Sequence, residues 1–244
     1  MLVVKVQTFI SEFTQVIISI IRIFFLSRVP SKLNIHKSSE NVVALANGPS
    51  LSKMYLEHKE FLEGKDCICV NNFPSSPLYT EIKPKYIIIS APSLWLESLG
   101  DSYTDILKNY YENLARNTTW DVVFFIPCDA RKRKLWKSII QNNQHISIKY
   151  YNNTPIEGWK WFSFLMFDWK LGMPRPQNVL VPALYNLLQL RYKNIYLWGV
   201  DHSWFKEISV TDDNVTLINQ KHFYDENESK PLPMKSGKGG TNVR

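Results

Sequence analysis

Cysteine is scarce in this chain, and the positions of its three cysteines exclude two classes of protein. Cys67, Cys69 and Cys128 do not make the framework of a disulfide-rich domain, and no CxxC pair or His/Cys cluster has the spacing of a zinc site. Cys67 and Cys69 alternate within an apolar run, so we expect them on one face of a strand. A reducing compartment is the simplest interpretation.

An acidic metal-binding triplet and nucleic-acid signatures are also missing. The sequence has no Asp-x-Asp triplet, so it predicts no divalent metal held on a diphosphate. Its net charge of +7 comes without an RNP motif, a KH loop or a zinc knuckle, so nucleic acid is not an expected partner. The charge leaves open an anionic membrane surface, an anionic small substrate or a solvated basic face.

Apolar residues, in contrast, are abundant in the chain. Hydrophobic residues make up 45% of its 244 positions, enough for a substantial core. Near the N-terminus, Phe9–Leu26 is mostly apolar, and five polar residues within it and directly before it recur three or four positions apart. On a helix they would form one narrow stripe: Thr8, Glu12, Gln15, Ser19 and Arg22.

We interpret residues 1–28 as a hydrophobic helix that associates with a membrane, peripheral or monotopic. Glu12 and Arg22 disfavour a simple spanning helix, and Leu26–Pro30 is a poor signal-peptide cleavage site. Basic residues within and after the helix favour the cytoplasmic side. The alternatives are a helix packed on the domain and an oligomer contact.

The rest of the chain alternates short apolar runs with helical segments. Residues 29–40 are predicted to be a linker, and residues 41–244 a single Rossmann-like domain. This alternation predicts an α/β fold, with a mostly parallel sheet and helices on both faces. Strands are expected at 42–46, 67–70, 86–89, 122–126, 146–150 and 195–200, and helices at 51–61, 102–115, 130–141 and 179–190.

Polar residues follow several of these strands. Ligands bind at the carboxyl ends of strands in such sheets, so this is where we expect a site. One group is Asn47, Gly48, Pro49 and Ser50, at a strand-to-helix turn where a glycine admits a close ligand and a helix N-terminus suits a phosphate. The alternative is an ordinary turn without a ligand. The others are Asn71 and Asn72, Ser90 and Ser93, and Asp201 and His202.

The run VVALANGPSL, Val42–Leu51, resembles the start of the bacterial sialyltransferases of glycosyltransferase family 42. It is also similar to the 6-hydroxymethylpterin pyrophosphokinase-like (MptE-like) domains, which share a Rossmann-type core. Three later segments keep the order of the sialyltransferase family: CVNNF at Cys69–Phe73, APSLWLE at Ala91–Glu97 and YKNIYLWGVDHSW at Tyr192–Trp204.

The resemblance assigns donor-binding roles to particular residues. Asn71 would contact the donor nucleotide, and Ser93 lies in a second donor segment, in which Ala91 replaces the family's asparagine. Asn178 would be the polar group at the start of the 179–190 helix, and Asp201 ends the last strand. With the turn, the donor-binding set is Asn47, Gly48, Pro49, Ser50, Asn71, Ser93, Asn178 and Asp201.

The chain departs from the family in two places. Ser203 and Trp204 stand where the family places phosphate-binding tyrosines, with Tyr224 further on. The chain ends shortly after Lys238-Gly239-Gly240, where the family continues with another helix and strand. We interpret the C-terminus as truncated or as a natural short form.

His222 is the predicted general base, because it lies in a polar loop where the resemblance places the base histidine. A histidine can take the proton of an attacking hydroxyl near neutral pH. His202 is the alternative base, and for both an ordinary structural or surface role stays open. No metal or other cofactor is required for a monophosphate leaving group; Mg²⁺ would be needed only for a pyrophosphokinase using ATP.

Two surface features stay open. The basic run Arg131–Lys134 with Lys137 is predicted on one helix face, as a solvated surface or as a contact to anionic lipid. The aromatic segment between Gly158 and Gly172 is either packed in the core or an exposed lid or membrane-contacting loop.

The sequence therefore predicts a metal-independent, inverting glycosyltransferase. It would use a nucleotide sugar, CMP-activated, in the synthesis of a bacterial surface glycan such as lipopolysaccharide or capsule. Its expected partners are the nucleotide sugar, a glycan or lipid-linked acceptor and the cytoplasmic face of the inner membrane; an oligomer is compatible with the sequence. The alternatives are an MptE-like pyrophosphokinase and a non-catalytic membrane-tethered remnant.

Overall fold

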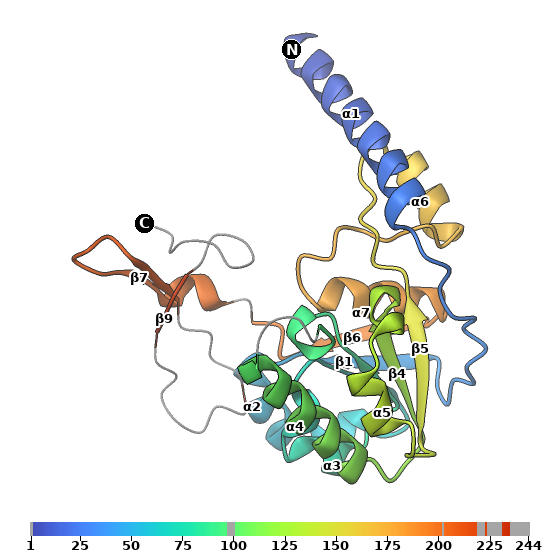
Figure 1. The fold of residues 1–244 in the computed structure, drawn as a ribbon, viewed down its shortest axis with the longest axis vertical. Coiled ribbons are helices and arrows are strands. Elements are labelled where there is room, and N and C mark those ends of the chain that lie inside the picture. Colours follow the sequence, from blue (N-terminus) through green and yellow to red (C-terminus); the bar gives the residue numbers. More distant parts are fainter. Residues whose placement is uncertain (1, 97–100, 202, 219–222, 224–230, 235–244) are drawn as a thin grey trace. The chain divides into compact units, whose positions relative to one another are not determined.

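The structure is a computed structural model and describes residues 2–96, 101–201, 203–218, 223 and 231–234. Its main sheet is parallel, with the strand order β5-β4-β3-β2-β1-β6 (Figure 1). This arrangement confirms the predicted Rossmann-like α/β class. The strands are β1 (Asn41–Leu45), β2 (Asp66–Val70), β3 (Tyr86–Ile88), β4 (Val122–Pro127), β5 (Ile146–Tyr151) and β6 (Asn194–Trp198).

Helices connect these strands, and short 3₁₀ turns accompany them. The α-helices are α1 (Leu2–Leu26), α2 (Ser50–His58), α3 (Leu78–Ile82), α4 (Asp101–Asn117), α5 (Leu135–Ile140), α6 (Lys160–Asp168) and α7 (Leu180–Gln189). The 3₁₀ turns include η1 (Lys59–Leu62), η2 (Phe73–Ser75), η3 (Pro92–Leu94), η5 (Cys128–Lys132) and η6 (Ser203–Glu207). After β6, the strands β7 (Ile208–Val210), β8 (Thr216–Ile218) and β9 (Leu232–Pro233) form a small antiparallel sheet.

The predicted basic helix over 130–141 is helical in two pieces, and its prediction as one continuous helix is wrong. Arg131 and Lys132 lie in η5, Arg133 is extended, and α5 begins only at Leu135. Ala130 and Trp136 are both buried, and the Trp136 indole donates a hydrogen bond of 3.2 Å to the Ala130 carbonyl. Residues six apart lie about 120° from each other around an α-helix, so burying both requires the break.

The chain divides into two compact units. One contains Met1–Ala44 and Gly64–Tyr196, and the other contains Leu45–Glu63 and Leu197–Arg244. The first unit holds α1, strands β2 to β5 and helices α3 to α7. The second holds α2 and the antiparallel β7-β8-β9 sheet, and the division passes through β1 and β6.

In the first unit, helices cover both faces of the sheet. On one face, Ala183 and Leu187 of α7 pack in a cluster with Ile68 and Ile88. On the other, the ring of Phe124 contacts Tyr111 of α4 and Trp136 of α5. Successive strand residues point to opposite faces, so buried residues without alternation, as in β2, are typical of a sheet covered twice.

The predicted linker follows the edge of the sheet. The Ser31 amide donates to the Tyr150 carbonyl at 2.8 Å, and the Tyr150 amide donates to Ser31 Oγ at 2.9 Å. Further along, Leu33 and Ile35 pack against the sheet core. The segment therefore covers the edge strand β5 and contributes to the core. An edge with unpaired amides would otherwise be a template for aggregation.

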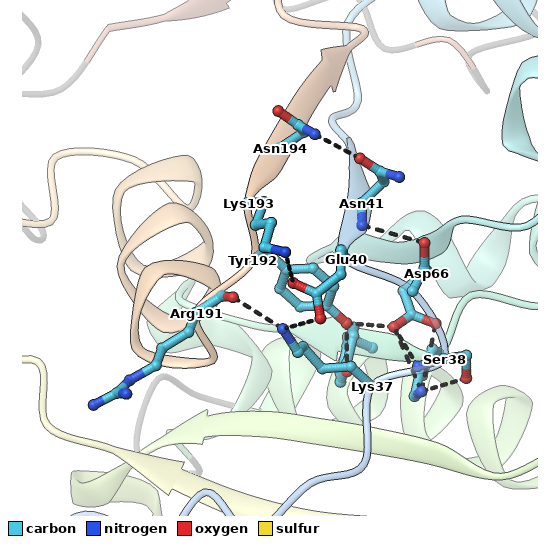
Figure 2. Close-up of polar contacts among 12 residues, drawn as sticks. Lys37, Ser38, Glu40, Asn41, Asp66, Arg191, Tyr192, Lys193 and Asn194 are labelled. Carbon is cyan, nitrogen blue, oxygen red and sulfur yellow. Dashed lines mark hydrogen bonds and ion pairs between the residues drawn. The ribbon is translucent and has the colours of Figure 1, made fainter.

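A buried carboxylate joins this segment to the amino ends of the strands (Figure 2). Asp66, the first residue of β2, accepts hydrogen bonds from the Ser38 amide at 3.0 Å and from the Tyr192 hydroxyl at 2.5 Å. The Lys85 ammonium lies 3.4 Å from its other oxygen. Burial and the hydrogen bonds of its hydroxyl to Asp66 and to the Tyr86 hydroxyl, the latter at 2.7 Å, raise the pKa of Tyr192 far above its ordinary value. The carboxylate is thereby paired, as a buried charge must be.

The N-terminal helix α1 docks through its polar stripe. Ser19 Oγ donates to the Glu157 carbonyl at 2.9 Å and accepts from the Glu157 amide at 2.8 Å. The Arg22 guanidinium lies 2.8 Å from the Glu157 carboxylate, which Arg175 also binds with two nitrogens. At Gly158 an added Cβ would lie 2.6 Å from a methyl of Val16, so this glycine permits the close approach. We call this group, in which Ser19, Arg22 and Arg175 all bind Glu157, the polar clamp.

The pattern of burial on α1 is the reverse of that on a surface helix of a soluble protein. Its polar residues Ser19 and Arg22 face the protein, whereas most of its apolar side chains are exposed. Over Val3–Leu26, α1 is also long and apolar enough to cross a membrane. An apolar N-terminal helix that could tether the chain to a membrane is therefore present, and it is at the same time packed on the domain.

We expect acid to weaken the clamp. The guanidinium groups of Arg175 and Arg22 lower the pKa of Glu157 from 4.5 to about 2. A depressed folded-state pKa contributes stability above the unfolded value, and this is lost as the pH falls from about 4.5 toward 2. In urea unfolding of the full chain in detergent, Glu157→Gln should cost ~1–2 kcal/mol at pH 7 and flatten the pH dependence in that window.

The exposed Glu63 provides the matched control for this carboxyl. Glu63→Gln should keep both the stability at pH 7 and its loss on acidification. A Glu157→Gln chain that loses stability between pH 4.5 and 2 as steeply as the unsubstituted chain would show that the clamp carboxyl is not responsible.

Candidate functional site

The turn after β1 is fixed against the chain that follows β6, within the second unit. The Ala46 amide donates to the Trp198 carbonyl, and the Gly48 amide donates to the Gly199 carbonyl, each at 2.9 Å. The Ser50 amide, at the first residue of α2, donates to the Asp201 carboxylate at 3.0 Å. The structure thus brings together five of the predicted residues: Asn47, Gly48, Pro49, Ser50 and Asp201.

Glycine is required in this turn for a reason internal to the protein. A Cβ on Gly48 would lie 2.1 Å from Asp201 Oδ2 and 2.4 Å from the Gly199 carbonyl oxygen. Gly199 has a φ of +68°, and a Cβ there would lie 2.7 Å from the Ala46 carbonyl oxygen. The two glycines therefore permit the two chain segments to touch, whether or not a ligand also approaches.

Asp201 changes the electrostatics expected of the turn. Its exposed carboxylate lies at the N-terminus of α2, where a negative charge interacts favourably with the helix dipole. The sequence suggested a phosphate at this position. The structure places a side-chain anion of the protein there instead, with lone pairs left to accept hydrogen bonds from hydroxyl groups.

Phe223 also contacts this turn, and sequence reasoning missed it. Its amide donates to the Asn47 carbonyl at 3.1 Å, and its own carbonyl accepts from Ser52 Oγ at 3.4 Å. No periodic pattern surrounds Phe223, so no sequence signal predicted the contact. The candidate base His222 precedes Phe223 in the chain; His222 and the alternative base His202 lie outside the described residues.

Asn71 organises a separate polar group in the first unit, at the carboxyl end of β2. It adopts a left-handed backbone with a φ of +44°, which asparagine tolerates better than most residues. Its side-chain oxygen accepts from the amides of Ser90 at 3.0 Å and Ala91 at 3.5 Å. Within the part of the chain that the structure describes, its side-chain nitrogen contacts no acceptor.

Tyr110 of α4 helps to fix the backbone of Asn71, because its hydroxyl donates to the Asn71 carbonyl at 3.0 Å. The helical period predicts an inward side chain at this position of the 102–115 helix, but the sequence does not identify its partner. Ser93 lies half-buried in η3, on the same connection as Ala91. The structure therefore gathers Asn71, Ser90 and Ala91, with Ser93 two residues further along.

Asn178 lies at the N-terminus of α7, where the sequence placed it. Its side-chain oxygen accepts from the amides of Leu180 at 3.0 Å and Val181 at 3.4 Å. An asparagine at this position satisfies amides that the helix itself leaves unpaired. This cap is a sufficient structural reason for Asn178, and its assignment to a donor site stays a prediction.

Metal ligands do not gather in the part of the chain that the structure describes. No group of three or more His, Cys, Asp or Glu side chains there could hold a metal ion. Cys67, Cys69 and Cys128 are free thiols, and all three are buried.

Comparison with known proteins adds no family. No protein-family model matches the chain, and no curated protein matches its sequence.

We expect Gly48→Ala to destabilise the fold by about 1–3 kcal/mol in urea unfolding, because the added methyl meets Asp201 and Gly199. The penalty should be smaller in an Asp201→Ala background, since the nearest clashing atom is then gone. Gly64→Ala is the comparison for backbone strain alone: Gly64 has a φ of +66° but no atom within 4 Å of its added Cβ, so its cost should not depend on Asp201. Strictly additive effects of Gly48→Ala and Asp201→Ala would contradict the contact.

Proposed function

We propose that this chain is a sialyltransferase-like glycosyltransferase that binds a CMP-activated sugar through the turn between β1 and α2. The observation that carries the proposal is the exposed Asp201 carboxylate, held at that turn by the Ser50 amide at 3.0 Å. The resemblance of Val42–Leu51 to glycosyltransferase family 42 supplies the substrate class. The parallel sheet is consistent with ligand binding at this end of the strands.

The part of the donor that meets Asp201 follows from charge. A donor phosphate beside Asp201 would be repelled, because the carboxylate already places a negative charge at the start of α2. Ribose or sugar hydroxyls instead donate hydrogen bonds to a carboxylate, and such charge-assisted bonds are the stronger kind. We therefore assign the hydroxyl-bearing part of the donor to Asp201.

The orientation of the Asn71 side chain, in the first unit, is a second argument for a nucleotide substrate. The resemblance assigns it to the donor nucleotide, and its side-chain nitrogen is free within the described residues while its oxygen is used by the Ser90 amide. The bond to Ser90 fixes the orientation of the amide group, so the nitrogen is held as a donor. A base carbonyl or ring nitrogen of a nucleotide is a matching acceptor.

The reaction would be a single displacement. The hydroxyl oxygen of a glycan or lipid-linked acceptor forms a bond to the anomeric carbon as the bond from that carbon to the phosphate oxygen breaks, and CMP leaves. Backside attack inverts the configuration at the anomeric carbon. In this proposal His222 takes the hydroxyl proton, with His202 as the alternative, and α1 holds the enzyme at the cytoplasmic face of the inner membrane.

Nucleotide-dependent thermal stabilisation tests the substrate class. We expect CMP to raise the melting temperature without a metal, since saturation at 100 times Kd stabilises by about 2.7 kcal/mol. CDP, UDP and ATP, each with and without Mg²⁺, are the comparisons. Stabilisation only by ATP with Mg²⁺ would indicate the pyrophosphokinase alternative, and no response to any nucleotide would indicate a non-catalytic remnant.

The same assay tests Asp201. Asp201→Asn keeps an acceptor for the Ser50 amide but loses the charge, so the affinity for CMP should fall about tenfold. Asp121→Asn, at an exposed aspartate that pairs with His145, should leave the affinity unchanged. An increase in affinity for Asp201→Asn would show that a phosphate faces this residue, because the substitution would then relieve repulsion.

Removal of the base should separate turnover from binding. His222→Ala is expected to lower the rate of CMP release from a CMP-sugar about 10²–10⁴-fold while CMP still stabilises the protein. His202→Ala is the paired variant and should retain turnover. Loss of turnover in His202→Ala, with activity kept in His222→Ala, would move the base to His202.

A further inference from the structure

Helix α6 exposes an aromatic face that the core does not use. Trp161 is 64% exposed, Phe164 is 62% exposed, and Trp169, directly after the helix, is 62% exposed. Positions 161, 164, 165 and 169 recur at the helical spacing of a single face. The adjacent face is also apolar, since Phe162 and Met166 are buried. The helix therefore has more apolar surface than packing on the domain requires.

This face continues onto α1. Val16 and Ile23 of α1 share a hydrophobic cluster with Phe162 and Met166 of α6, so the two helices lie side by side (Figure 1). Trp159, before α6, lies with its ring centroid 5.5 Å from that of Phe9. The apolar residues that α1 leaves exposed are Val3, Val4, Val6, Phe9, Ile10, Phe13, Ile17, Ile20, Ile21, Phe24, Phe25 and Leu26.

The charges around this apolar surface suit a lipid leaflet. Lys160 begins α6, and Lys170 follows Trp169. Arg28 follows the last exposed apolar residues of α1, and Arg131 donates to the Val29 carbonyl at 3.0 Å. Tryptophan beside lysine or arginine is typical of the boundary between acyl chains and headgroups. The acidic Glu157 is neutralised in the polar clamp, which leaves Asp168 as the acid that α6 itself carries.

We propose that the aromatic face of α6 inserts beside α1 into one leaflet of a membrane with anionic lipids, so that two helices make the membrane contact. The inference rests on the proposed membrane association of α1 and extends it to residues 160–170. The occupant is lipid because the 24 apolar-rich residues Val3–Leu26 extend about 36 Å as a helix, comparable with a hydrocarbon core of about 30 Å. The hydrophobic cluster of Val16, Phe162 and Met166 packs α6 against this same helix, and the polar clamp binds Glu157, three residues before α6.

An environment-sensitive fluorophore on a single introduced cysteine tests the proposal on the full chain. The three native thiols are buried, and burial raises the pKa of Cys67 to about 12 and that of Cys128 to about 11, so labelling should favour an exposed new cysteine. Phe164→Cys places the label on the aromatic face. Ile106→Cys, at a 54% exposed apolar position of α4, is the matched control.

With vesicles of phosphatidylcholine and phosphatidylglycerol, the label at position 164 should brighten severalfold, shift to the blue and be quenched by nitroxide lipids. The label at position 106 should do none of these. Omission of phosphatidylglycerol should weaken the response at position 164, because Lys160 and Lys170 lose their anionic partners.

Two results would overturn the proposal. The chain could float with the vesicles while the label at position 164 stays in water, which would leave α1 as a tether without α6. Alternatively, the label could be shielded without lipid, in step with protein concentration and a larger particle, which would identify a second copy as the occupant. CMP stabilisation measured on the same labelled proteins separates either failure from a failure of the proposed enzymatic function.

Discussion

The polar clamp between α1 and Glu157 determines which face of this apolar helix is exposed. Ser19 and Arg22 are two polar groups of α1 that would be costly to leave in lipid, and both are satisfied by Glu157, which Arg175 also binds. With these groups facing inward, most of the apolar side chains of α1 are exposed. A charge pair that would contribute little on an open surface here fixes which face of a 25-residue helix remains exposed.

The same requirement for paired polar groups shapes the two ends of the sheet. At the amino ends, Asp66 is surrounded by donors from the 29–40 segment and from Tyr192, which ties that segment to the fold. At the carboxyl ends, backbone amides fix polar side chains within each unit: in the second unit the Ser50 amide binds the exposed Asp201 carboxylate, and in the first unit the Ser90 amide binds the Asn71 side-chain oxygen. The arrangement at the amino ends stabilises the fold.

Asp201 shows why a sequence motif and its chemistry can differ. Read along the chain, Asn47–Ser50 before a helix suggests a phosphate site, because a glycine and a helix N-terminus come together there. The folded chain brings a carboxylate from 151 residues away to that N-terminus, and the glycine is needed to admit it. The proposed contact with hydroxyl groups follows from this charge, which no local pattern contains.

The sequence by itself determined the α/β class, the position of most strands and the polar stripe of α1, because these depend on side-chain period and on turn residues close in the chain. It predicted neither α6 nor the β7-β8-β9 sheet, whose two- and three-residue strands are too short to show a period. Only the tertiary structure decided which face of α1 is covered. Glu157 is 135 residues from Arg22, and such a partner is selected by folding, not by local propensity.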